Sequence, residues 1–157
     1  MIIGIVAVDR NGAIGKDGKL PWHYSADMKF FKETTIGNAC VMGYTTWLTL
    51  KKPLVDRLNI VLSRTRDVEP HESVVVYRDV ESVLEKAKTL DGDLFVMGGE
   101  QVYRSFLPHI EKWFVTEVPL SVEGADTFMP TNYLDGFDLT ASKMLDEELF
   151  VSVYEKK

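Results

Sequence analysis

One acid stands among aromatic and apolar residues in the segment LPWHYSADMKFF, residues 20–31. In a helix that begins after Ser25, Asp27 shares a face with Phe30 and Phe31, which follow it by three and four residues. A carboxylate on an apolar face costs free energy unless it is paired. If Ser25 is the N-cap, Asp27 lies in the first turn, where the helix dipole stabilises an acid by about 0.3–1 kcal/mol. Asp27 is therefore either a helix-start residue that faces water or an acid held in a pocket for a planar ligand with two parallel N–H donors.

Two other segments place glycine between an apolar run and a predicted helix. VMG (41–43) precedes YTTW, and VMGG (96–99) precedes EQVY. Glycine lets a ligand approach the backbone, and the helix N-terminus that follows offers free N–H groups and a partial positive charge. In a parallel sheet both junctions lie at the carboxyl edge, where ligands bind. The pair predicts a pyrophosphate site, although tight strand–helix turns alone would also explain the glycines.

Two loop segments are open to a functional and a structural interpretation. GAIGKDG (12–18) fits neither a dinucleotide fingerprint nor a P-loop. It is either a solvated loop or a mobile lid, in which Leu20 and Trp22 would cover a ligand. SRTR (63–66) ends an apolar run with a hydroxyl and two arginines. Such a turn either binds phosphate or is simply solvated.

Several classes of site and partner are not expected. The three histidines lack metal-ligand spacing, no nucleophile elbow is present, and Cys40 in ACVMG is predicted to be an inert buried thiol. The net charge of −6 and the lack of a long basic run argue against nucleic acid and anionic membranes as partners. The N-terminal apolar run is not that of a signal peptide, and no stretch approaches the about 20 apolar residues of a membrane span. With one cysteine, the chain is predicted to be cytoplasmic.

The elements that must position these residues alternate along the chain. Apolar runs predict strands at 2–8, 39–43, 58–63, 73–77 and 93–99, and helices are predicted at 25–35, 44–50, 80–90 and 100–107. Asp79 is the predicted N-cap of the third helix, and Pro108 is expected to stop the fourth. Segments 112–118 and 150–156 are strand-like, with 138–145 between them and a turn at 146–148. The pattern predicts one α/β domain over 1–157: a mostly parallel, mixed sheet of about eight strands, helices on both faces and an antiparallel C-terminal edge.

Taken together, these motifs resemble those of the bacterial chromosomal type of the dihydrofolate reductase family. The resemblance runs from end to end and rests on AVDRNGAIGKDGKLPWHYSADMKFFKETT, VMGYTTWLTLKKPLVDRLNIVLSR, FVMGGEQVYRSFLP, WFVTEV and EGADTFMP. It implies reduction of 7,8-dihydrofolate by NADPH, with hydride transfer from nicotinamide C4 to pterin C6 and protonation at N5. It also implies a monomer that binds antifolates of the diaminopyrimidine and pteridine type. Two alternatives stay open: a reductase of the same fold that acts on a riboflavin-pathway pyrimidine, and a non-catalytic folate-binding protein.

The resemblance further implies roles for individual residues. Asp27 would bind the 2-amino group and N3 of the pterin and assist protonation at N5, Thr116 would hydrogen-bond Asp27, and Trp22 completes the catalytic group. Arg57 would pair with the α-carboxylate of the glutamate tail, in a pocket lined by Ile5, Val6, Ala7, Met28, Phe31, Leu50 and Leu54. The implied cofactor-binding residues are Ala7, Ile14, Gly15, Leu20, Gly43, Tyr44, Thr45, Thr46, Leu62, Ser63, Arg64, Met97, Gly98, Gly99, Glu100, Gln101 and Val102. No metal is implied.

The same resemblance raises three points about the site. Residues 9–24 match the family's mobile lid, and because Asp27 would lie far from N5, a water that the lid admits is the expected proton donor. Gly98 and Gly99 match a pair joined by a cis peptide bond. Many relatives carry arginine at the position of Tyr44, which would weaken one phosphate contact unless Arg64 compensates at the adenosine 2′-phosphate. We expect preference for NADPH over NADH, with Tyr44 either stacked on adenine or filling surface.

Overall fold

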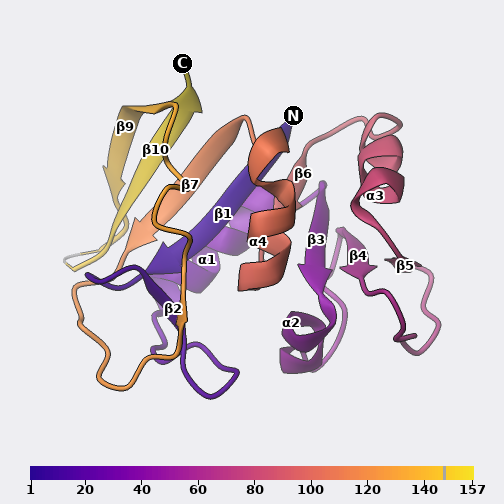
Figure 1. The fold of residues 1–157 in the computed structure, drawn as a ribbon, viewed down its shortest axis with the longest axis horizontal. Helices are drawn as coiled ribbons and strands as arrows, with labels where there is room; N and C mark the ends of the chain where they lie inside the picture. The colour runs from indigo at the N-terminus through magenta and orange to yellow at the C-terminus, as the bar shows by residue number, and fades with distance from the viewer. Residues whose placement is uncertain (147) are drawn as a thin grey trace.

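The computed structural model describes residues 1–146 and 148–157, which build an eight-stranded sheet (Figure 1). Its order is β5 (Val74–Tyr77), β4 (Leu58–Leu62), β3 (Ala39–Gly43), β6 (Leu94–Val96), β1 (Ile2–Val8), β7 (Lys112–Glu117), β10 (Phe150–Lys156) and β9 (Phe137–Met144). Neighbours from β5 to β7 run parallel, whereas β10 is antiparallel to both β7 and β9. The predicted mixed sheet with an antiparallel C-terminal edge is confirmed.

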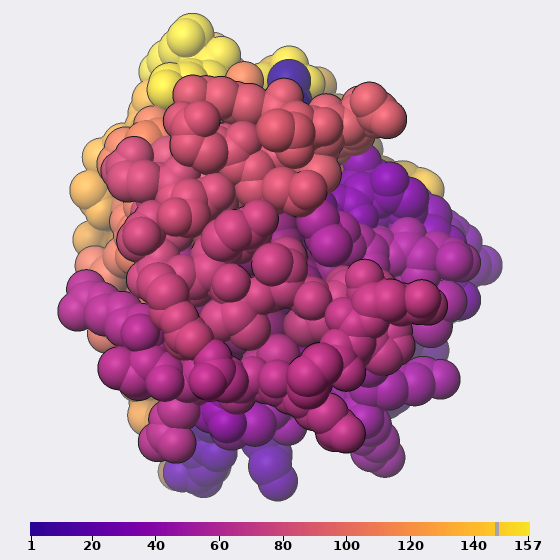
Figure 2. Space-filling view, turned by 90° about the vertical axis from the view of Figure 1, so that its right-hand side faces the viewer, coloured from indigo at the N-terminus to yellow at the C-terminus, as the bar shows by residue number. Residues whose placement is uncertain are grey.

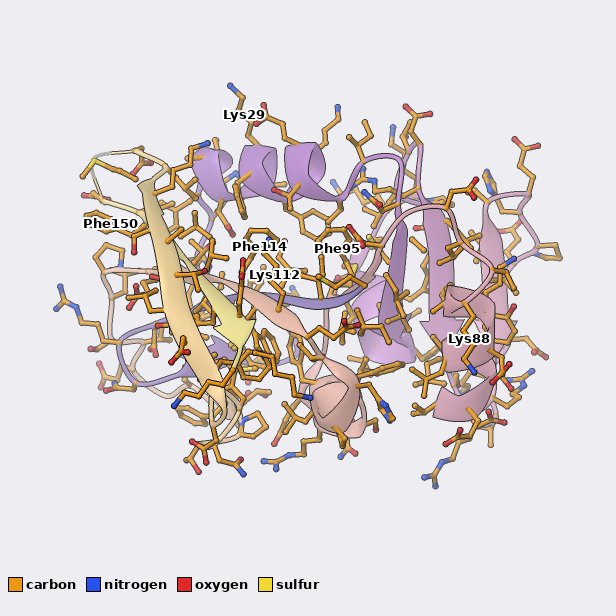
Figure 3. The ribbon with its side chains drawn as sticks, turned by 90° about the horizontal axis from the view of Figure 1, so that it is seen from above. Lys29, Lys88, Phe95, Lys112, Phe114 and Phe150 are labelled. Carbon is orange, nitrogen blue, oxygen red and sulfur yellow. The ribbon has the colours of Figure 1, made fainter. Side chains whose placement is uncertain are left out.

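Helices cover both faces of this sheet because each buries an apolar stripe against it. The cluster on one face includes Phe31 from α1 (Ser25–Thr35) and Trp47 from α2 (Tyr44–Thr49). The cluster on the other face includes Val83 from α3 (Val80–Ala87) and Phe106 from α4 (Glu100–Phe106). Figure 3 shows α1 and α4 on opposite sides of the strands, with the rings of Phe95 and Phe114 between the sheet and α1. No helix of the described residues is long and apolar enough to cross a membrane.

Most predicted elements agree with the observed bounds to within one residue, whereas β6 covers only Leu94–Val96 of the strand predicted at 93–99. The third helix ends at Ala87 rather than at residue 90, although Asp79 caps it as predicted by accepting the Ser82 N–H at 2.7 Å. Pro108 was expected to stop the fourth helix, and α4 ends at Phe106. A 3₁₀ turn, η1 (Leu107–His109), follows directly and contains Pro108. Proline is tolerated there because the N–H groups of a first helical turn have no intrahelical partner. The predicted turn at 146–148 includes residue 147, which lies outside the described residues.

A small second sheet was not predicted. β2 (Ala13–Gly15) pairs antiparallel with β8 (Thr127–Phe128), more than 100 residues further along the chain. Both strands are too short to show a hydrophobic period, so the loop interpretation of residues 12–18 missed them. The pairing of β2 with β8 joins the segment 9–24 to the segment 118–128, beside the carboxyl end of β1.

Gly4 is required where a buried indole lies against β1. Gly4 and Trp113 are neighbours across β1 and β7, and a Cβ atom at position 4 would overlap the Trp113 ring. Trp113 is fully buried and is held by Tyr103 and Tyr133, whose ring centroids lie 5.8 and 5.1 Å away. We expect Gly4→Ala to lower the free energy of unfolding by about 1–3 kcal/mol, because overpacking forces the ring to move.

Urea unfolding measures this loss. In the double variant Gly4→Ala/Trp113→Phe the smaller ring leaves room for the methyl group, so the two losses should not add. A Gly4→Ala protein with the wild-type unfolding midpoint would contradict the packing described for this strand pair.

Candidate active site

Asp27 occupies the third position of α1, with its carboxyl partly buried. The helix begins at Ser25, in agreement with the predicted helix 25–35, and follows the extended residue Tyr24, which provides no side-chain cap; of the two possibilities considered for Ser25, it is the first helical residue and not the N-cap. Burial raises the pKa of Asp27, and the hydrogen bond donated by the Thr116 hydroxyl opposes that rise. Thr116 is itself buried on β7. An acid whose pKa is raised by burial, with a buried hydroxyl that favours its charged form, is typical of a functional site.

The predicted substrate-lining residues gather mainly in the apolar cluster between the sheet and α1. Ile5, Phe31, Leu50 and Leu54 belong to this cluster, beside the edge-to-face pair formed by Phe30 and Phe114. Successive strand residues point to opposite faces, and Val6 accordingly belongs to the cluster on the α3–α4 face. Its side chain therefore does not line the same wall as that of Ile5. Ala7 is partly buried and Met28 is exposed.

Arg57 lies at the other end of this wall, near the amino end of β4. Only 8% of the residue is exposed, and the guanidinium donates from Nε to the Val55 carbonyl and from Nη1 to Thr35 Oγ1, each at 3.0 Å. It also lies 5.8 Å from the ring centroid of Phe31. No ion pair of the described residues involves Arg57, so this buried cation is available to an anionic ligand.

The two glycine junctions meet at the carboxyl edge of the sheet, as predicted. The Gly43 N–H donates to the Gly98 carbonyl at 2.9 Å, which joins the end of β3 to the segment after β6. The Gly98–Gly99 peptide bond is cis, in agreement with the expectation from the family. α2, which carries Thr45 and Thr46, begins directly after Gly43, and α4, which carries Gln101 and Val102, begins after Gly99.

A cavity of about 350 Å³ lies beside these junctions, between the ends of β4 and β5 and the helices α3 and α4. It is lined by five predicted cofactor-binding residues, namely Leu62, Ser63, Arg64, Gln101 and Val102, and by Arg78, Asp79, Val80 and Ser105, which were not predicted. The segment 63–80 that forms one wall lies on the face shown in Figure 2, coloured magenta. Tyr44 does not line this cavity; the Arg66 guanidinium lies over its ring, 5.6 Å from the centroid.

The predicted lid segment 9–24 is anchored at its start and exposed further on. The Asp9 carboxylate accepts the N–H groups of Asn11, Ala13 and Val122, each at 2.8 Å. Burial raises the pKa of Asp9, but these three donors outweigh it and leave the pKa below its usual range. Asp126 likewise accepts the Asp17 N–H at 2.9 Å. Both acids bind segments far apart in the chain, so no local spacing could reveal their role.

The remaining lid residues have contrasting environments. Ile14 and Gly15 lie in β2, whereas Leu20 is 60% exposed. The indole Nε1 of Trp22 is buried without a protein hydrogen-bond partner among the described residues, which marks a donor that a ligand or water would satisfy.

Two further side chains bear on the prediction. Tyr103, which was not predicted, is buried on α4 and donates to the Ile5 carbonyl at 2.7 Å, so it fixes the backbone at the floor of the site. Cys40 is fully buried, and burial raises the pKa of its thiol to about 11, as expected of an inert cysteine.

A doubly covered, mostly parallel sheet is typical of α/β enzymes that bind a nucleotide beside a small substrate when it carries an acid on one face and, at its carboxyl edge, glycine junctions beside a cavity. The family described as dihydrofolate reductase matches residues 1–153. The chain belongs to the dihydrofolate reductase family.

Individual relatives agree with this assignment. The dihydrofolate reductase of Staphylococcus haemolyticus is 32% identical over 158 residues, which cover 97% of this chain and 93% of that protein. The enzyme of Enterococcus faecium is 34% identical over 148 residues, covering 94% and 85%. A structure of dihydrofolate reductase from Enterococcus faecalis, complexed with NADP(H) and RAB-propyl, superposes with a TM-score of 0.89 at 34% identity and covers 99% of this chain and 96% of that one.

Proposed function

We propose that residues 1–157 form one catalytic unit that reduces 7,8-dihydrofolate to 5,6,7,8-tetrahydrofolate with NADPH, for one-carbon and thymidylate metabolism. The observation that carries this proposal is the partly buried Asp27, whose pKa is raised by burial, a rise that the buried hydroxyl of Thr116 opposes, on an apolar wall that ends at the buried cation Arg57. An acid at one end of an apolar wall and a cation at the other match a ligand with N–H donors, an aromatic middle and a carboxylate.

The residues at the carboxyl edge fit the cofactor. The cavity beside α3 and α4 presents apolar Leu62 and Val102 together with the exposed cation Arg64, which suits an adenosine with a 2′-phosphate. Gly43 and Gly98 bring backbone rather than side chains to the neighbouring edge, where a pyrophosphate would lie. NADPH, when bound, supplies the hydride that the pterin C6 receives.

The chain's own side chains position the substrate and manage its proton. Asp27 accepts from the 2-amino group and N3 of the pterin, and Thr116 keeps its carboxyl in that orientation. Phe31, Leu50 and Leu54 exclude water from the ring and the benzoyl portion, and Arg57 pairs with the tail carboxylate. Because Asp27 binds the edge far from N5, a water admitted beside Trp22 delivers the proton to N5. Exclusion of bulk water strengthens each of these electrostatic contacts.

One assay tests the activity against its alternatives. Protein, NADPH and micromolar dihydrofolate are mixed, and the nicotinamide absorbance band is followed, with the riboflavin-pathway pyrimidine as the parallel substrate. We expect NADPH oxidation with dihydrofolate only. Oxidation with the pyrimidine alone would assign the chain to the other reductase, and tight folate binding without oxidation would make it a binding protein.

Arg64 is expected to carry much of the preference for NADPH over NADH. Arg64→Ala should raise the Kd for NADPH by about tenfold, the effect of losing about 1.4 kcal/mol of a charge-assisted contact, and leave that for NADH nearly unchanged. Fluorescence titration of both cofactors measures this. If the variant keeps the wild-type ratio of the two Kd values, another residue recognises the 2′-phosphate.

We also propose that the chain works as a cytoplasmic monomer, without nucleic acid or membrane. Antifolates of the diaminopyrimidine and pteridine type should occupy the Asp27 pocket, because they offer the same pair of N–H donors to its carboxylate. A calorimetric titration with a diaminopyrimidine, before and after Asp27→Asn substitution, measures that contact.

A further inference from the structure

The loop of residues 51–57, between α2 and β4, carries the last two residues of the substrate wall, Leu54 and Arg57. The loop forms neither helix nor strand, so no ladder of main-chain hydrogen bonds fixes its path. Asp56 within it has a φ of 57°, in the left-handed region that few residues other than glycine adopt. The positions of Leu54 and Arg57 therefore depend on contacts with the neighbouring elements.

Asn59, on β4, makes such contacts with its side-chain amide. The residue is fully buried, and its Oδ1 accepts the Leu54 N–H at 2.8 Å. Its Nδ2 donates to the Leu54 carbonyl at 3.0 Å and to the Arg57 carbonyl at 3.1 Å. The same nitrogen lies 3.3 Å from the carbonyl oxygen of Ser73, just before β5. One amide therefore joins both ends of the segment 54–57 to the sheet.

The chemistry of these partners calls for an amide at position 59. The Leu54 N–H can only donate a hydrogen bond, and the Leu54 and Arg57 carbonyls can only accept one, so the neighbours settle the orientation of the amide. A carboxylate would accept from Leu54 but would set a second oxygen against the two carbonyls. An apolar side chain would leave all three main-chain groups without this partner, which is unfavourable away from water.

The guanidinium of Arg57 depends on the same loop. Its Nε donates to the Val55 carbonyl at 3.0 Å, and Val55 lies between the two residues that Asn59 binds. Its other hydrogen bond, from Nη1 to Thr35 Oγ1 at 3.0 Å, goes to α1. A shift of the loop would move the Val55 carbonyl relative to Thr35 and would turn the planar guanidinium that spans them.

Asn59 can act on a ligand only through this loop. Leu58 and Ile60 pack in the cluster on the α3–α4 face, so Asn59 between them points to the face of the substrate wall, as alternation along a strand requires. Its Oδ1 and Nδ2 are bonded to main-chain groups, and the side chain has no exposed surface. The amide therefore does not touch the substrate.

We propose that Asn59 is a positioning residue for the benzoyl-glutamate portion of the substrate: its amide fixes the segment 54–57 so that Leu54 completes the apolar wall and Arg57 presents its guanidinium to the tail carboxylate. This inference rests on the proposed function, in which the wall receives 7,8-dihydrofolate. It makes recognition of the tail depend on a side chain that is buried beside the sheet and does not contact the ligand.

Steady-state kinetics with 7,8-dihydrofolate and with a dihydropterin that lacks the benzoyl-glutamate portion test the proposal. Asn59→Asp should raise KM for dihydrofolate by about tenfold and change kcat by less than about twofold, because the weakened contact lies far from the reacting ring. KM for the dihydropterin should stay within about twofold of the wild-type value, since that ligand does not reach Leu54 and Arg57. Asn59→Ser, which adds no charge, should raise KM for dihydrofolate by about fivefold with the same selectivity.

Ser152→Ala is the matched control for loss of a buried hydrogen bond. Ser152 is a buried polar residue of the same sheet that donates to Glu117 Oε2 at 2.8 Å, but it lies on β10, far along the strand order from β4. Like the Asn59 variants, the control should unfold at a lower urea concentration, but it should keep the wild-type KM for both substrates. Asn59 variants that unfold earlier yet keep the wild-type KM for dihydrofolate, or that raise KM equally for both substrates, would overturn the proposal.

The double variant Asn59→Asp/Arg57→Ala shows whether Asn59 acts through Arg57. Its KM for dihydrofolate should lie within about threefold of that of Arg57→Ala, because the guanidinium to be positioned is already missing. A further rise of about tenfold would show that the two residues act independently and would overturn the proposal. A wild-type protein that does not reduce dihydrofolate would overturn the proposed function itself, whereas wild-type turnover combined with additive variants overturns the role of Asn59 alone.

Discussion

Replacement of Asp27 by asparagine is expected to lower kcat for dihydrofolate by about 10²–10⁴-fold at neutral pH, the usual contribution of a positioned acid. The amide keeps the shape of the side chain but cannot accept two parallel N–H donors or assist a proton transfer. Part of the lost turnover should return at acidic pH, where the solvent protonates the substrate. Steady-state kinetics from acidic to neutral pH measure both effects.

The same substitution should stabilise the fold at neutral pH. Because burial raises the pKa of Asp27 in the folded state, the folded protein keeps its proton to higher pH than the unfolded chain does. The free energy of unfolding of the wild type therefore falls as pH rises from the unfolded-state pKa of Asp27 through its folded-state pKa, and Asp27→Asn lacks this loss. A catalytic acid is expected to show this opposition between activity and stability.

Glu33→Gln is the matched control for Asp27→Asn. It removes one negative charge from the same helix, where Glu33 is exposed and lies 3.9 Å from Lys29. Figure 3 shows Lys29 pointing away from the sheet. The control should leave kcat and its pH profile unchanged. An Asp27→Asn protein with wild-type rates across the pH range would remove Asp27 from the reaction.

Replacement of Arg57 by alanine is expected to raise KM for dihydrofolate by at least roughly 30-fold, since loss of one partner of a buried charge pair costs about 2–5 kcal/mol. The effect should fall mainly on KM, because the tail carboxylate is distant from the reacting ring and its contact is present throughout the reaction. Arg57→Lys should recover little of the wild-type KM, because an ammonium lacks the planar guanidinium geometry that Thr35 and Val55 hold in place.

A dihydropterin without the glutamate tail is the control ligand for Arg57. Wild type and Arg57→Ala should reduce it with equal kcat/KM, since the group that Arg57 binds is missing. If the variant has an equally reduced kcat/KM on both substrates, Arg57 maintains the structure of the pocket and does not bind the glutamate tail. Thermal unfolding of the variant reports separately on the loss of its bonds to Thr35 and Val55.

The central elements could be predicted from the sequence because their signals are local. The continuous apolar run at 2–8 gives β1, and Asp79 caps α3 as its type and position indicate. The two glycine junctions at 43 and 98–99 could be assigned to one sheet edge from strand–helix alternation alone. The pairing of Thr116 with Asp27 came from the resemblance to the family, because the two residues lie on separate elements.

The contacts that hold the loops could not be predicted in this way. Asp9 binds the N–H of Val122, 113 residues further on, and β2 pairs with β8 over a similar separation. Arg78 was outside every motif, since the acceptors of its guanidinium, in residues 63–67, lie beside it only when β4 and β5 are paired. In each case tertiary geometry outweighs local preference.

A single turnover with NADPH deuterated at the transferable C4 position tests the central claim most directly. Wild-type protein is mixed with this cofactor and 7,8-dihydrofolate, and the product is examined by NMR and mass spectrometry. We predict tetrahydrofolate that carries one deuterium, bound at C6, with a hydrogen from solvent at N5. Product without deuterium, deuterium at another position, or no product would contradict the assignment of this site to dihydrofolate reduction.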